Sequence, residues 1–144
     1  MAMTRLRKPE VFLDTSYAVA LVAPTDRHHL QAKDLAQDLE RLRIRLVTTR
    51  AVLLEIGNSF SRSRYKTAVI NLLTVLEVDP RVEILPFSEE LFHRGFELFR
   101  QRPDKAWSLV DCVFFAVMRE RKLQDCLTTD GHFAQAGFRA LLRN

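Results

Sequence analysis

Hydrophobic and polar positions follow two different periods along this chain. Short runs of apolar or β-branched residues predict strands at residues 11–13, 45–49, 82–85 and 126–129, with a closing edge strand at 138–142. Between these runs, apolar residues recur with gaps of three and four, which predicts helices at residues 17–22, 26–42, 50–64, 67–77, 88–102 and 108–121, and a helical turn after Asp130. Strands that alternate with helices indicate an α/β fold, with a parallel sheet covered by helices on both faces.

Length and composition fit one domain. The chain has 144 residues, of which 47% are hydrophobic and 28% are charged, and no repeat or linker interrupts it. We therefore expect a single domain over residues 1–144, with a flexible basic segment at 1–9. The formal net charge of +4 permits a polyanionic partner but is too small to establish one.

The cysteines and the lengths of the apolar runs indicate the cellular compartment of the protein. Cys112 and Cys126 lack the spacing of a zinc site or a redox pair, so we expect both to be small buried residues in a reducing compartment. No apolar run is long enough to span a membrane, and the N-terminal segment lacks the apolar core of a signal peptide. A cytoplasmic location without membrane contact is expected.

Two predicted strands end at an acidic residue. Asp14 ends the first run and Asp130 ends the fourth. Ligands of open parallel sheets bind in the crevice beyond the carboxyl ends of the strands, so both carboxylates are expected in one crevice. A simpler alternative is that each Asp caps the helix that follows it.

Two further acidic residues occupy helix positions. Glu55 and Asn58 lie on the face of the 50–64 helix away from its apolar stripe, where a solvated side chain is the simplest interpretation. Asp111 lies three residues after Ser108 at a helix start, a spacing that fits a capping box and that could also hold the carboxylate in a fixed direction. Several carboxylates in one crevice repel one another, and a hard divalent cation such as Mg²⁺ removes that repulsion.

The four acidic residues stand in motifs that resemble the PIN-domain family, a group of small metal-dependent nucleases that includes the VapC-type toxins. The matching segments are, in chain order, Phe12-Leu13-Asp14-Thr15-Ser16, Leu54-Glu55-Ile56-Gly57-Asn58, Trp107-Ser108-Leu109-Val110-Asp111-Cys112 and Leu127-Thr128-Thr129-Asp130. Each motif is weak by itself, whereas the ordered set covers nearly the whole chain.

The resemblance implies a three-layer α/β/α sandwich with a small parallel sheet, and an endoribonuclease that cleaves single-stranded or structured RNA with Mg²⁺ or Mn²⁺. It implies a homodimer and an antitoxin protein that covers the acidic site. The implied catalytic and metal-binding residues are Asp14, Glu55, Asp111 and Asp130. The residues expected to support them are Thr15, Ser108, Asn58 and Asp104.

Basic and aromatic residues near these motifs could bind RNA. The candidates are Arg50, Arg62, Arg64, Lys105 and Trp107. Trp107 could stack on an unpaired base, or it could pack on its own domain at the helix start. Asp104 is either an extra carboxylate at the rim of the site or a turn residue beside Lys105.

Two other functions are alternatives. A phosphatase of the haloacid dehalogenase type also begins with a strand that ends in Asp, but it needs a second Asp two residues later, where this chain has Ser16. A non-catalytic interaction module on the same fold would use the acidic crevice to bind a basic peptide. RNA cleavage in Mn²⁺, compared with EDTA, separates the nuclease from this module.

Overall fold

The computed structural model describes residues 10–62 and 64–143, so the expected flexible segment at 1–9 lies outside the described residues. Within this part of the chain, five parallel strands form one sheet in the order β3-β2-β1-β4-β5. The strands are β1 (Glu10–Leu13), β2 (Arg45–Thr49), β3 (Val82–Leu85), β4 (Asp125–Leu127) and β5 (Arg139–Ala140). The chain builds outward from β1 to β3 and then returns to the other side of β1, which makes the β1/β4 boundary the switch point where α/β proteins bind ligands.

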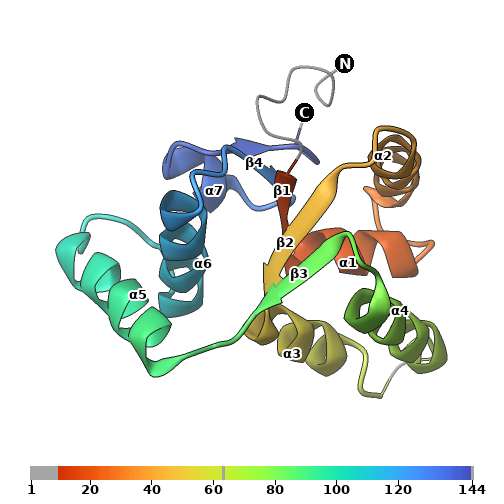
Figure 1. The fold of residues 1–144 in the computed structure, drawn as a ribbon, viewed down its shortest axis with the longest axis horizontal. Coiled ribbons are helices and arrows are strands. Elements are labelled where there is room, and N and C mark those ends of the chain that lie inside the picture. The colour runs from red at the N-terminus through yellow and green to blue at the C-terminus, as the bar shows by residue number, and fades with distance from the viewer. Residues whose placement is uncertain (1–9, 63, 144) are drawn as a thin grey trace.

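Helices connect the strands and cover both faces of the sheet. They are α1 (Thr15–Val22), α2 (His29–Arg41), α3 (Arg50–Ser59), α4 (Lys66–Val78), α5 (Glu89–Gln101), α6 (Leu109–Glu120) and α7 (Gly131–Gln135). Figure 1 shows α1, α2 and α4 on one side of the strands and α5 and α6 on the other. The predicted three-layer α/β/α architecture is confirmed. Among the described residues, none of the helices has both the length and the apolar character needed to cross a membrane.

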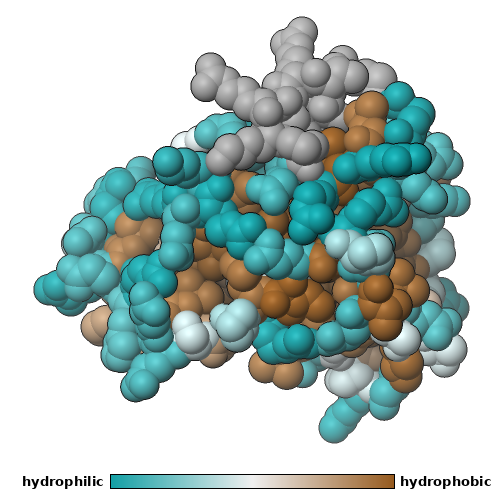
Figure 2. Space-filling view, in the orientation of Figure 1, coloured by the Kyte–Doolittle hydropathy of each residue, from teal (hydrophilic) through white to brown (hydrophobic). Residues whose placement is uncertain are grey.

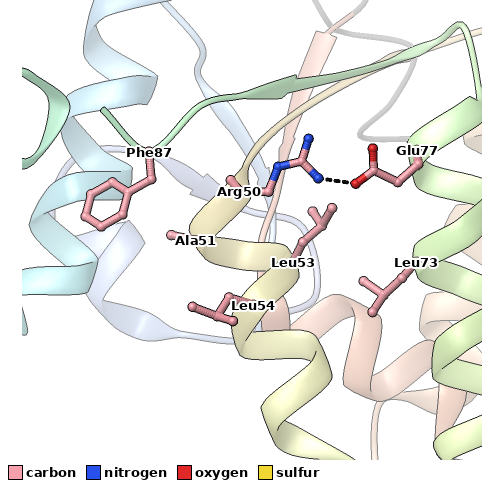
Figure 3. A pocket seen from close by; sticks show the side chains of 7 residues that line it. All are labelled: Arg50, Ala51, Leu53, Leu54, Leu73, Glu77 and Phe87. Carbon is pink, nitrogen blue, oxygen red and sulfur yellow. Dashed lines mark hydrogen bonds and ion pairs between the residues drawn. The ribbon is translucent and has the colours of Figure 1, made fainter. Parts of the chain in front are cut away.

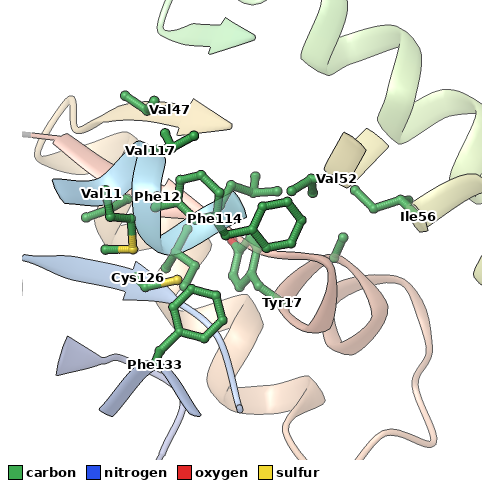
Figure 4. Packing of buried hydrophobic residues seen from close by; sticks show 14 of the residues in the cluster. Val11, Phe12, Tyr17, Val47, Val52, Ile56, Phe114, Val117, Cys126 and Phe133 are labelled. Carbon is green, nitrogen blue, oxygen red and sulfur yellow. The ribbon is translucent and has the colours of Figure 1, made fainter. Parts of the chain in front are cut away.

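Strand β1 runs through the centre of the hydrophobic core. Val11, Phe12 and Leu13 are at most 2% exposed, because strands flank β1 on both sides and helices cover both faces. The Phe12 ring lies 5.5 Å from the ring of Phe114 in α6 and 6.5 Å from that of Phe133 in α7 (Figure 4). This packing fixes the position of the backbone at Asp14, the first residue after the strand.

Some element boundaries differ from those predicted by the spacing of apolar residues. Helix α3 ends at Ser59 rather than near residue 64, because Phe60 leaves the helical conformation and buries its ring edge-on against Tyr65, with 6.0 Å between centroids. The closing strand is confined to Arg139–Ala140, since the chain turns directly afterwards. The predicted burial of the two cysteines is confirmed, because both are free and fully buried.

Candidate active site

The four acidic residues of the sequence motifs meet at the carboxyl end of the sheet. Strands β1 and β4 pair with Leu13 opposite Leu127, and the Asp14 N–H donates to the Leu127 carbonyl at 3.3 Å, so their ends are adjacent. A recess of about 380 Å³ opens there. Its lining residues are Asp14, Thr15, Ser16, Glu55, Ser108, Val110, Asp111, Phe114 and Asp130.

Asp14 is a buried carboxylate held by two hydroxyl groups. Its Oδ2 accepts hydrogen bonds from Thr128 Oγ1 at 2.7 Å and Ser16 Oγ at 2.9 Å, and the residue is 6% exposed. Burial raises the pKa of Asp14, while these hydrogen bonds partly oppose the rise. Asp14 occupies the N-cap position of α1 but makes no side-chain capping bond, so helix capping does not account for its orientation.

Glu55 enters the recess from α3, whose residues Val52, Leu53 and Ile56 are buried in the core. Its Oε1 accepts a hydrogen bond from Thr15 Oγ1 at 2.8 Å. Burial raises the pKa of Glu55, and the charges of Asp14 and Asp111 raise it further, against the opposing effect of the Thr15 hydrogen bond. The carboxylates are therefore near enough to repel one another, and Glu55 is not a freely solvated surface residue.

Asp111 both caps its helix and lines the recess. The Asp111 N–H donates to Ser108 Oγ at 3.0 Å, while Asp111 Oδ2 accepts from the Ser108 N–H at 3.0 Å. This reciprocal pair is the capping box predicted from the spacing of the two residues. The cap fixes the direction of the carboxylate and leaves its second oxygen without a role in the capping box.

Asp130 follows β4 and begins α7. Its Oδ1 accepts from the His132 N–H at 2.9 Å, so this Asp does cap a helical turn. The ring of His132 also faces the site, with Nδ1 3.1 Å from Asp111 Oδ2 and 3.4 Å from Asp130 Oδ1. His132 lies outside the four sequence motifs, although its position two residues after Asp130 at a helix start was a usable signal.

Two hydroxyl residues of the site were also missed. Ser16 and Thr128 both bond to Asp14, and Ser16 Oγ and Thr128 Oγ1 are 3.1 Å apart. The Ser16 hydroxyl accepts from the Thr129 N–H at 3.0 Å, and the Thr128 hydroxyl accepts from the Asp130 N–H at 3.0 Å. They join the loops after β1 and β4. Their positions, two residues after Asp14 and two residues before Asp130, were the only indication in the sequence.

The donor set fits a divalent cation. Four carboxylates line one recess, and none of the described residues that line it is a lysine or arginine. Asp111, Asp130 and His132 each offer one ligand atom, and these atoms lie within 4.8 Å of one another. Oxygen donors with at most a single imidazole suit hard or borderline divalent metals. A cation would also relieve the repulsion by Asp14 and Asp111 that adds to burial in raising the pKa of Glu55.

The basic residues expected to bind RNA do not line this recess. Arg50 forms an ion pair with Glu77 of α4, beside a separate apolar recess between α3 and α4 (Figure 3). Arg64 bonds to the Tyr65 hydroxyl at 3.0 Å and lies over its ring. Arg62 is exposed and Lys105 is half-buried, both outside the recess lining. Any contact of these residues with RNA would lie outside the acidic recess.

Three other residues expected at the site, Trp107, Asp104 and Asn58, have surroundings that indicate a structural or surface role. Trp107 is 4% exposed, packs edge-on against Phe115 with 5.1 Å between centroids, and donates from Nε1 to Gln135 at 3.1 Å. Its ring faces are therefore unavailable for base stacking. Asp104 forms an exposed ion pair with Arg102 at 2.9 Å and does not reach the recess. Asn58 is exposed on α3, one helical turn beyond Glu55, and does not line the recess either.

Comparison with known proteins identifies the class of this acidic α/β domain. A family model of the PIN domain matches residues 11–139. The chain belongs to the PIN-domain family. The predicted class, a metal-dependent ribonuclease of the VapC type, is confirmed by this match together with the relatives below. The match decides against the phosphatase alternative.

A named relative covers almost the same length. The 23S rRNA-specific endonuclease VapC20 of two Mycobacterium tuberculosis strains is 29% identical over 133 residues, which are 89% of this chain and 95% of the relative. The crystal structure of M. tuberculosis VapC20, described as a sarcin-ricin loop cleaving toxin, superposes with a TM-score of 0.78 at 26% identity, over 89% of this chain and 95% of that one. The structure of Rickettsia felis VapBC2 bound to promoter DNA has a TM-score of 0.65 at 17% identity, over 91% and 96% of the two chains, and supports the fold alone.

Proposed function

We propose that Asp14, Glu55, Asp111 and Asp130 are the catalytic acidic residues and hold Mg²⁺ or Mn²⁺, and that the substrate is a single-stranded loop of a structured RNA. The observation that carries this proposal is the convergence of the four carboxylates on one recess without a neighbouring lysine or arginine in its lining. The substrate class is supported by VapC20, which is named as a 23S rRNA-specific endonuclease. An RNA substrate also agrees with the cytoplasmic location expected from the sequence.

The protein supplies positioning in this mechanism. The four carboxylates would hold the metal, which would supply an activated water and stabilisation of the charge on the phosphate. Ser16 and Thr128 hold Asp14, and Thr15 holds Glu55. The Ser108 backbone holds Asp111. In each of these bonds a hydroxyl or N–H group donates to a carboxylate oxygen. The bonds therefore favour the ionised form of the carboxylate, which a metal requires.

Asp14 and Glu55 are both affected by burial. Both have a raised pKa, with burial as its main cause, so both hold a proton more readily than an exposed carboxyl group. Cation binding must then displace protons at acidic pH, which predicts weaker metal binding and slower cleavage as the pH falls. Thr15 and Thr128 limit this effect by stabilising the charged forms.

A protein antitoxin would bind over the acidic recess. VapC20 is described as a toxin, and a recess lined by carboxylates suits an arginine or lysine from a partner. Such a cation would satisfy the charges that the metal satisfies. The interaction would therefore block cleavage directly.

A homodimer is part of the same proposal. Four phenylalanines, Phe87, Phe92, Phe96 and Phe99, are between 38% and 48% exposed on α5 and the loop before it. Figure 2 shows hydrophobic surface across the middle and lower part of the face on which α3 and α5 lie. Apolar area of this kind is typical of protein interfaces. Sedimentation of the wild type and of Phe96→Asp tests it, and a wild-type monomer at micromolar concentration would contradict the dimer.

The central test is cleavage of an RNA hairpin with a sarcin-ricin-type loop, with a fully base-paired hairpin as the control substrate. We expect cleavage of the loop in millimolar Mg²⁺ or Mn²⁺, none in EDTA, and none by Asp14→Asn. Cleavage that persists in EDTA would contradict the metal site. A folded, metal-loaded protein that cuts neither this loop nor generic single-stranded RNA would favour the non-catalytic interaction module.

A further inference from the structure

His132 lies beside two of the four carboxylates, and the established activity does not explain its orientation. It stands in the first turn of α7 with its side chain 34% exposed. Its Nδ1 lies 3.1 Å from Asp111 Oδ2 and 3.4 Å from Asp130 Oδ1. The ring flanks the recess rather than lining it. One nitrogen atom thus faces oxygens from two different elements.

The spacing of the three groups fits a shared metal ion. One ligand atom from each of Asp111, Asp130 and His132 lies within 4.8 Å of the other two. For metal–ligand bonds of about 2.1 Å, neighbouring ligand atoms in an octahedral complex are about 3 Å apart and opposite ones about 4.2 Å apart. The three groups therefore need only small movements to surround one ion.

The hydrogen bonds of the two carboxylates leave capacity for a metal. Asp111 Oδ2 accepts one backbone bond from Ser108, and Asp130 Oδ1 accepts one from His132. Each carboxylate oxygen has two lone pairs, so one on each oxygen remains for another partner. The backbone bonds hold both carboxylates in place independently of the imidazole. The neutral tautomer of His132 that carries its proton on Nε2 would direct the Nδ1 lone pair into the same space.

We propose that His132 is a nitrogen ligand of the bound cation, together with Asp111 and Asp130, and that it makes the site prefer a divalent transition metal to Mg²⁺. The inference rests on the proposed function, because it concerns the same site. Mg²⁺ binds oxygen donors and keeps several waters, whereas first-row transition metals accept imidazole readily. Four carboxylates alone would discriminate little between Mg²⁺ and a divalent transition metal. Mn²⁺ is the probe, because it is paramagnetic.

Pulsed electron paramagnetic resonance of Mn²⁺ bound to the full chain tests the nitrogen ligand directly. Wild type should show the electron spin echo modulation of a coordinated imidazole nitrogen, and ¹⁵N-histidine labelling should change its frequency. His132→Gln should lose the signal, since glutamine offers an amide oxygen at a similar reach. His93→Gln is the matched control: His93 lies exposed on α5, 3.9 Å from Glu89, and its variant should keep the signal.

Calorimetric titration of the same proteins with Mn²⁺ and with Mg²⁺ tests the proposed metal preference. His132→Gln should weaken Mn²⁺ binding at least about tenfold and change Mg²⁺ binding by less than about threefold. Equal weakening for both metals would mean that His132 only supports the carboxylates, and would overturn the inference. Bound Mn²⁺ without nitrogen modulation in wild type would overturn it too, while leaving the proposed function intact. Failure of wild type to bind Mn²⁺ at millimolar concentration would instead overturn the proposed function.

Discussion

Thr15 and Glu55 are 40 residues apart in the chain and are joined by a hydrogen bond of 2.8 Å at the rim of the acidic recess. Thr15 begins α1 and Glu55 lies in the middle of α3, so the bond links the helices that follow β1 and β2. It also opposes the burial and charge repulsion that raise the pKa of Glu55.

Thr15→Val should move the acidic limb of the pH profile of RNA cleavage to higher pH. The variant keeps the shape of the side chain but removes the bond that lowers the pKa of Glu55, and Glu55 must be ionised to serve a metal. The measurement is kcat/KM against pH at saturating Mn²⁺. Thr67→Val, at an exposed position of α4, is the control. A profile that coincides with wild type would remove Thr15 from the site.

Asp14→Asn should abolish cleavage and raise the stability of the metal-free protein at neutral pH. Because burial raises the folded-state pKa above the unfolded value of 3.8, the contribution of Asp14 to stability is complete below that value and is lost as the pH rises through the folded pKa. At neutral pH the wild type therefore carries the cost of a buried charge that asparagine does not carry.

Thermal melting of Asp14→Asn and wild type in EDTA, at a series of pH values, measures this difference. The melting temperatures should be closest at acidic pH and should separate in favour of the variant as the pH rises. Cleavage should fall by at least about 100-fold, since the change removes a ligand charge. A variant that melts below wild type at neutral pH would show that the Asp14 hydrogen bonds outweigh its burial.

Asp111→Asn should separate the capping and metal-binding roles that the structure combines. Loss of half of the capping box should cost at most about 1 kcal/mol in EDTA, partly offset by relief of repulsion within the recess. In Mn²⁺ at about 100 times its Kd, wild type should gain about 2.7 kcal/mol, and the variant should lose most of that gain.

Asp104→Asn is the matched control for Asp111→Asn, because Asp104 is paired with Arg102 outside the recess. It should respond to Mn²⁺ as wild type does and should cut RNA normally. If Asp111→Asn behaves in the same way, Asp111 is a helix cap only.

Trp107 should contribute to stability and not to base stacking. Trp107→Ala removes a ring packed against Phe115 and should lower the free energy of unfolding by about 3–5 kcal/mol. Trp107 is the single tryptophan of the chain, so all tryptophan fluorescence comes from this position. In wild type with Ca²⁺ in place of Mg²⁺, addition of substrate RNA should leave the emission almost unchanged. Strong quenching would restore the stacking hypothesis.

The sequence by itself determined most of the local structure. The apolar run at Val11 to Leu13 predicts a strand buried on both faces, and the structure has one there. The spacing of Ser108 and Asp111 predicts the capping box that is present. The helical period separates Glu55 from the apolar stripe of Leu53 and Ile56, and Glu55 lines the recess while those two residues are buried in the core. These features were predictable because hydrogen bonds and side-chain directions within one strand or helix repeat with a known period.

The tertiary structure decided which side chains share a site. The hydroxyl of Thr128 reaches Asp14, 114 positions away, only because β4 pairs with β1. The periodicity of apolar residues within single strands and helices does not predict this strand order. Arg50 is close to Glu55 in the sequence, but α4 brings Glu77 to Arg50, and the two form an ion pair.

Trp107 is buried because α7 and α6 supply Gln135 and Phe115. His132 joins the carboxylates because α7 begins beside α6. Contacts of this kind depend on how the elements pack, and packing depends on the whole chain at once.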